Sequence, residues 1–82
     1  MPKLKVFRTT IGFYDAIVAA PSMKAAIEAW GARPNIFRQG LAKEIHDPRL
    51  VKLARAKPRL VFRRLVGARG DFEPAKGRFK PL

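Results

Sequence analysis

The residues best suited to chemistry in this chain are basic, and many of them lie between residues 48 and 70, a stretch without an acidic residue. Guanidinium and ammonium groups bind phosphate oxygens, and each neutralised phosphate releases condensed counterions, which adds affinity without reading a base sequence. The segment therefore predicts contacts to a phosphate backbone. We expect these contacts from Arg49, Lys52, Arg55, Arg59, Arg63 and Arg64, and the segment also contains Lys57 and Arg69.

A second basic group lies near the amino end and consists of Lys3, Lys5 and Arg8. We expect Lys3 and Lys5 to extend the phosphate-binding surface if their strand neighbours the strand of the later arginines. Because side chains alternate across a strand, Arg63 and Arg64 point to opposite faces, and only one of them can share a given patch.

The charge balance favours a polyanion as the partner. Eighteen Lys and Arg residues stand against six Asp and Glu residues, which gives a formal net charge of +12 and a pI near 11.5. Such an excess repels itself unless anions condense on it, and nucleic acid is an abundant cytoplasmic polyanion. The same charge can also arise from a genome biased toward Arg and Ala, or from a solvated helix face beside a sheet edge that Lys and Arg protect from pairing.

Three aromatic residues of the amino-terminal region, Phe7, Phe13 and Tyr14, lie near basic residues. Sheet-surface aromatics in such surroundings stack on bases in RNA-recognition folds. Aromatic residues of a hairpin more often belong to the core, and the sequence has no signature of an RNA-recognition fold. Both interpretations stay open.

The sequence contains few residues of the types that carry out catalysis. Ser22 and His46 are the only serine and the only histidine, and Ser22 is placed to cap a helix. Glu44, His46 and Asp47 are close in sequence, but Asp47 is also placed as a helix cap, so a surface or structural histidine is the better interpretation. We predict a protein that is not an enzyme and holds neither a cofactor nor a metal ion.

The predicted strands and helices that position these residues indicate an α+β fold. It has a small antiparallel or mixed sheet and two short helices. Alternation over residues 3–9 and an apolar run over 13–20 flank Gly12 and predict a β-hairpin. Ser22 begins a helix over 23–30, which should pack on the hairpin through Trp30.

The second half of the chain predicts four further features. A helix begins where Asp47 can cap and Pro48 can occupy the first turn, and it presents an apolar arc opposite its basic residues. We expect both helices on one side of the sheet. The predicted elements are a loop or single turn over 32–40, a short edge strand over 41–46, the helix from 48 to about 56, and a strand over 59–66.

Length and composition predict one small domain. The chain has 82 residues, 48% of them hydrophobic, and contains no cysteine. We expect a compact α+β domain over residues 1–68 and a flexible basic tail over 69–82, which carries prolines, glycines and mixed charge. Charge at every second or third position of the amino end, and apolar runs too short to span a bilayer, predict a cytoplasmic protein without a membrane partner.

One long stretch resembles known proteins. Residues 5–16 read KVFRTTIGFYDA, and they continue through APS at 20–22 and KAA at 24–26 to AWGA at 29–32. This run resembles a group of small alphaproteobacterial proteins often found on plasmids and integrated elements. The resemblance covers residues 3 to about 70 and implies a mobile-element setting and a domain boundary, but it transfers no catalytic or binding residue.

These observations predict a non-enzymatic nucleic-acid-binding module that contacts phosphates through a basic helix and strand. The alternative is a protein–protein interaction adaptor or inhibitor that docks an acidic partner and is anchored by a buried aromatic ring, with Phe37 or Phe72 as candidates. An exposed apolar patch would favour the adaptor, and a bare basic face would favour nucleic acid.

Overall fold

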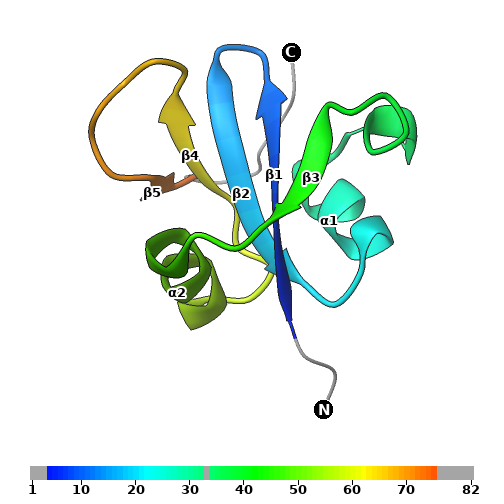
Figure 1. Cartoon of the computed structure of the whole chain (residues 1–82), viewed down its shortest axis with the longest axis horizontal. Helices are drawn as coiled ribbons and strands as arrows, with labels where there is room; N and C mark the ends of the chain where they lie inside the picture. The colour runs from blue at the N-terminus through cyan, green and yellow to red at the C-terminus, as the bar shows by residue number, and fades with distance from the viewer. Residues whose placement is uncertain (1–3, 33, 76–82) are drawn as a thin grey trace.

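The chain folds into a five-stranded antiparallel sheet with two helices, which confirms the predicted α+β class (Figure 1). The computed structural model describes residues 4–32 and 34–75. The sheet has the order β3-β1-β2-β4-β5. In chain order the elements are β1 (Lys5–Ile11), β2 (Tyr14–Ala20), α1 (Met23–Trp30), the 3₁₀ helix η1 (Pro34–Ile36), β3 (Ala42–Ile45), α2 (Pro48–Ala56), β4 (Phe62–Leu65) and β5 (Glu73–Pro74).

The predicted hairpin is formed by β1 and β2. Ile11 pairs with Tyr14, so the connection contains two residues, Gly12 and Phe13. Gly12 has φ of 60°, a conformation that glycine adopts without steric cost at the first central position of a hairpin turn. The hairpin therefore projects the Phe13 side chain from the end of the sheet.

Both helices begin where their capping residues predict, and α1 also ends at a glycine. In α1 the Ser22 hydroxyl accepts a hydrogen bond from the Ala25 N–H at 3.2 Å, and Gly31 ends the helix with φ of 68°. In α2 the Asp47 carboxylate accepts from the Arg49 N–H at 2.9 Å, and Pro48 occupies the first turn. These short local patterns determine where both helices begin and where α1 ends.

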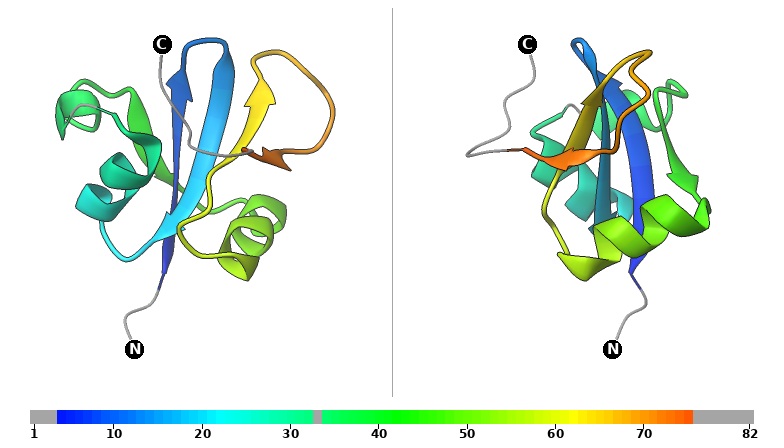
Figure 2. Two further views of the ribbon diagram at one scale, coloured as in Figure 1. Left: turned by 180° about the vertical axis from the view of Figure 1, so that it is seen from behind. Right: turned by 90° about the vertical axis from the view of Figure 1, so that its left-hand side faces the viewer.

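The helices pack on opposite faces of the sheet, so the expectation that they share one side is wrong (Figure 2). Trp30 of α1 lies in a core cluster with Phe7 and Val18, whereas Ala54 of α2 lies in a second cluster with Val6 and Ile17. Neighbouring residues of one strand point to opposite faces, so a strand buried along its whole length needs cover on both. The molecule has three layers: helix, sheet and helix.

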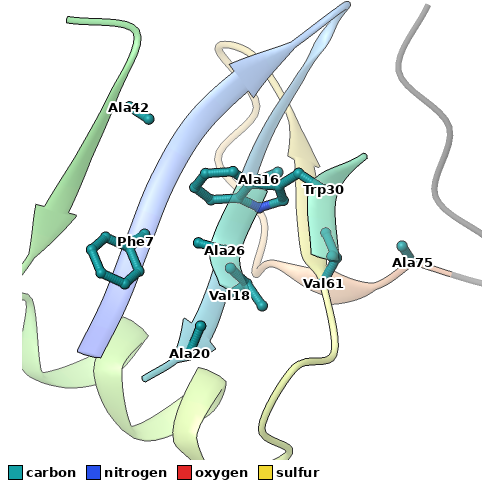
Figure 3. Packing of buried hydrophobic residues seen from close by; sticks show 9 residues of the cluster. All are labelled: Phe7, Ala16, Val18, Ala20, Ala26, Trp30, Ala42, Val61 and Ala75. Carbon is teal, nitrogen blue, oxygen red and sulfur yellow. The ribbon is translucent and has the colours of Figure 1, made fainter. Parts of the chain in front are cut away.

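Small side chains on β2 make room for the largest core residue. Trp30 is completely buried and packs over a surface to which Ala16, Val18 and Ala20 contribute (Figure 3). A bulky residue at either alanine would hold the helix away from the strand, because protein interiors are close-packed. The prediction that α1 packs on the hairpin through Trp30 is confirmed.

The carboxy-terminal part of the sheet differs from prediction at both ends. The strand predicted over 59–66 is shorter, because Arg59 has φ of 68° and belongs to a turn. The boundary predicted at residue 68 is too early: β5 pairs with β4, and Phe72 and Ala75 are 4% and 7% exposed. Phe72 joins the cluster under α2, which places residues 69–75 in the fold; residues 76–82 of the predicted tail lie outside the described residues.

Over residues 4–32 and 34–75, no helix combines the length and the apolar composition needed to cross a membrane.

Candidate functional site

Helix α2 presents basic side chains along one exposed side. Its buried side is centred on Ala54, which packs in the cluster beneath the helix with partly buried Leu50, Val51 and Leu53 around it. The opposite side carries Arg49, Lys52 and Arg55, all exposed. They recur every third residue, so successive residues of the set are about 4.5 Å apart along the helix axis. We call these three residues the helix face.

Arg55 is the most firmly positioned residue of the helix face. Its Nε and one terminal nitrogen donate to the carbonyl oxygen of Leu4 at 3.1 and 2.7 Å. The guanidinium group thereby ties the carboxy-terminal turn of α2 to the chain just before β1. Its net charge is not compensated by this carbonyl, and the side chain stays exposed.

A cleft of about 560 Å³ lies beside the amino-terminal end of α2, between the helix, the sheet and the loop that joins β4 to β5. Four arginines from separate parts of the chain line it. They are Arg8 of β1, Arg49 of α2, Arg64 of β4 and Arg69 of the loop, accompanied by the acidic residues Asp47 and Asp71. We call this feature the arginine cleft, and Arg49 joins it to the helix face.

Arg64 is fixed within the arginine cleft by its neighbours. Its guanidinium carbon lies 4.4 Å from the centroid of the Phe72 ring, and one terminal nitrogen donates to the Gly70 carbonyl oxygen at 3.1 Å. Among the described residues, the buried Nε of Arg64 has no hydrogen-bond partner. A planar cation held on an aromatic ring is pre-organised for an anion, because little side-chain freedom is left to lose.

The other arginines of the cleft differ in how strongly acids compensate them. Arg8 forms an ion pair with Asp15 at 3.0 Å, and the Asp15 side chain is only 11% exposed. Arg49 lies 3.5 Å from Asp71, but both side chains are 88% exposed. Exposed pairs are screened by water and contribute little. Arg49 can therefore exchange its partner for a phosphate, whereas Arg8 stays committed to Asp15.

The structure brings some of the predicted phosphate contacts together and separates others. Arg63 lies on the opposite face from Arg64, with its guanidinium carbon 4.4 Å from the Tyr14 ring centroid. Arg59 is exposed in the turn after α2. Lys5 pairs with Ala20, at the end of the sheet far from the hairpin turn, and Lys3 lies outside the described residues. The predicted set is thus one surface around α2 with outlying members.

The two basic groups do not merge through neighbouring strands, because β2 separates β1 from β4 in the sheet. Arg8 nevertheless reaches the same cleft as Arg64. Its place there follows from strand alternation: it shares a face with Val6, which packs under α2. The glycine-rich surroundings of Arg69 predict a tail, but the burial of Phe72 and the pairing of β5 with β4 hold its loop against the sheet.

The aromatic candidates fall into three environments. Phe7 is 2% exposed and belongs to the core, and Tyr14 is half-buried beneath Arg63. Phe13, at the turn, is 73% exposed. Of the two adaptor anchors, Phe72 is buried, and Phe37 is half-buried against Trp30 and Phe7 at ring-centroid distances of 6.2 and 5.4 Å. Phe72 therefore cannot serve as an anchor.

Two of the residues considered for catalysis and metal binding cap helices, and the others are exposed. Asp47 caps α2, Ser22 caps α1, and His46 is exposed. In the part of the chain that the structure describes, no group of three or more His, Cys, Asp and Glu side chains is placed to hold a metal ion.

Comparison with known proteins adds no further constraint: no protein-family model matches the chain, and no similar curated protein or solved structure is found. The resemblance to mobile-element proteins stays a prediction.

Proposed function

We propose that this protein is a non-enzymatic module that binds nucleic acid through its phosphates. One observation carries the proposal: the helix face and the arginine cleft share Arg49 and form one continuous basic surface. Affinity for a polyanion depends on how many phosphates a surface neutralises together, so contiguity matters more than net charge. A cytoplasmic location and an association with mobile elements accompany the proposal as predictions from the sequence.

The phosphate contacts are those basic residues of this surface that no buried acid compensates. Arg8 is omitted because its charge is matched by Asp15. Arg59 lies beyond the end of the helix and is a peripheral contact. The central contacts are Arg49, Lys52, Arg55, Arg64 and Arg69.

Removing two exposed contacts tests the proposal without disturbing the core. Arg49→Ala combined with Arg69→Ala should weaken binding at 0.1 M salt by roughly 60-fold for short duplex DNA and roughly 25-fold for single strands, since each phosphate contact contributes about 0.9 or about 0.7 to the salt slope. The measurement is fluorescence polarisation with labelled DNA and RNA. Both side chains are exposed, so the variant should unfold at the same temperature as the parent.

The matched control removes two charges elsewhere. Lys24 on α1 and Arg38 after η1 are exposed and do not line the arginine cleft. The variant Lys24→Ala with Arg38→Ala has the same net charge as the test variant, and its affinity should stay close to that of the parent. Equal weakening by both variants would show that net charge alone governs binding and would refute the assignment of this surface.

A protein–protein adaptor is the second candidate, and the exposed apolar side chains at the end of the hairpin favour it. Phe13, Leu65 and Val66 are all more than half exposed. An adaptor would bind an acidic protein with the basic surface around this patch. If the parent fails to bind any oligonucleotide at low salt but forms a complex with an acidic protein, this candidate replaces the first.

A further inference from the structure

The end of the β1–β2 hairpin exposes an aromatic ring with two aliphatic neighbours. Phe13 is 73% exposed, and Leu65 and Val66, at the end of β4, are 52% and 57% exposed. Single exposed apolar residues are common on protein surfaces, but here three occupy neighbouring backbone positions at one end of the sheet. We call Phe13, Leu65 and Val66 the hairpin tip.

The backbone of the hairpin tip is held firmly although its side chains face water. Phe13 occupies a two-residue turn, and its carbonyl oxygen accepts a hydrogen bond from the Val66 N–H at 2.9 Å. The next residue, Tyr14, pairs with Leu65. A ring on a braced turn loses little conformational freedom when it binds a partner, so the tip is pre-organised.

Positive charge surrounds the tip on both faces of the sheet. Arg63 and Arg64 precede Leu65, and each lies over an aromatic ring, Tyr14 and Phe72 respectively. Arg64 pairs with Asp15, two residues from Phe13, which places the Cα atoms of Phe13 and Arg64 roughly 8 Å apart at ordinary strand spacings. The tip therefore lies next to the arginine cleft.

We propose that Phe13 stacks on an unpaired nucleobase of a strand whose phosphates enter the arginine cleft. This inference rests on the proposed function and adds a base contact to it. Single-stranded binding surfaces combine a positively charged groove with aromatic rings, and stacking tolerates any base because every base has a π face. An unpaired base is required, since bases within a duplex are already stacked on their neighbours.

The hairpin tip by itself is smaller than a complete protein interface, so a protein partner would have to cover the basic surface around it as well. A standard protein interface covers about 800 Å² on each partner, whereas one buried aromatic side chain supplies only about 150–250 Å². Two aliphatic neighbours do not close that difference. One ring flanked by arginines matches the chemistry of a single nucleotide, which joins a flat base to an anionic phosphate group.

The test compares Phe13→Ala with Phe13→Trp on the full chain. The probe is a short single-stranded DNA that contains 2-aminopurine, whose fluorescence is quenched by stacking. We expect Phe13→Ala to weaken binding by about 5- to 150-fold and to abolish the protein-induced fluorescence change, while Phe13→Trp retains both. Met23→Ala is the control, because Met23 is similarly exposed at 55% but begins α1, beyond the other end of β2.

The outcomes separate this inference from the proposed function. If Arg49→Ala with Arg69→Ala weakens binding while Phe13→Ala changes neither affinity nor fluorescence, the phosphate surface stands and the stacking contact is overturned. If the parent binds no oligonucleotide at low salt, both the proposed function and the stacking contact are refuted. If the free protein self-associates in sedimentation experiments and Phe13→Ala abolishes this, the tip is a contact between two copies and the stacking contact is overturned.

Discussion

The salt dependence of binding is the most quantitative consequence of the basic surface. Five side chains are its central contacts: Arg49, Lys52, Arg55, Arg64 and Arg69. At about 0.9 per contact on duplex DNA, they predict a slope of about −4.5 in a plot of log affinity against log salt concentration. Between 20 and 100 mM salt, the parent should lose about 1400-fold in affinity.

The informative perturbation is Arg49→Ala combined with Lys52→Ala. Arg55 is left in place because it donates to the Leu4 carbonyl oxygen, so its removal would also affect stability. Three remaining contacts predict a slope of about −2.7 and a loss of only about 80-fold over the same range. Fluorescence polarisation with one labelled duplex at several salt concentrations measures both slopes.

Two results would refute this reasoning. A parent slope between 0 and about −1 would mean that the five residues do not act together on phosphates. An unchanged slope in the variant, with affinity lowered equally at every salt concentration, would mean that the helix face acts through folding or through neutral contacts. Circular dichroism of both proteins checks that the variant is folded.

Four further predictions concern three single residues and the net charge of the chain. Asp71→Asn should raise affinity for duplex DNA by up to about 5-fold, because it frees Arg49 from an exposed ion pair; weaker binding in polarisation assays would contradict this. Phe72→Ala should lower the free energy of unfolding by about 3–5 kcal/mol in urea denaturation, because Phe72 is 4% exposed beneath α2; a loss below about 1 kcal/mol would return residues 69–75 to a tail. Arg59→Gly should raise that free energy by up to about 1 kcal/mol, because glycine removes the strain of φ at 68°; calorimetry that shows destabilisation would contradict it. The melting temperature of the free protein should rise from 20 to 200 mM salt, since screening relieves the repulsion of a +12 chain, and a falling melting temperature would count against net repulsion.

The parts of the fold that depend on local chemistry are predictable from the sequence. Both helices have the predicted boundaries because capping acts within a few residues, as Ser22 and Asp47 show. The hairpin follows from two apolar runs around Gly12. The side of the sheet that each helix covers is a long-range property. The one sequence signal for it is the continuous apolar run from Ala16 to Ala20, all of which is buried. A strand buried on both faces reads as a continuous apolar run.

The candidate site shows the same division between local and long-range information. The helix face follows from the spacing of Arg49, Lys52 and Arg55 within one element, and the structure exposes all three. The arginine cleft depends on four segments that meet in space, and its loop is positioned by Phe72, which packs from a segment predicted to be tail. A single aromatic residue in a basic, glycine-containing stretch has no periodicity, so the sequence offers no pattern that would predict its burial.

The three-layer arrangement limits where this protein can meet a ligand. RNA-recognition folds leave one sheet face open, so that aromatic side chains can stack on bases across it. Here α1 and α2 cover both faces of the central strands, and Phe7, which would be such a surface aromatic, is 2% exposed. Accessible places that remain around the hairpin and α2 include the outer side of α2, the cleft beside it and the end of the hairpin. The helix face and the arginines of the cleft occupy the first two, and Phe13, the most exposed large hydrophobic residue over residues 4–32 and 34–75, occupies the third. A ligand that uses these surfaces together needs regularly spaced anionic groups joined to flat apolar ones, which is the chemistry of a single nucleic-acid strand.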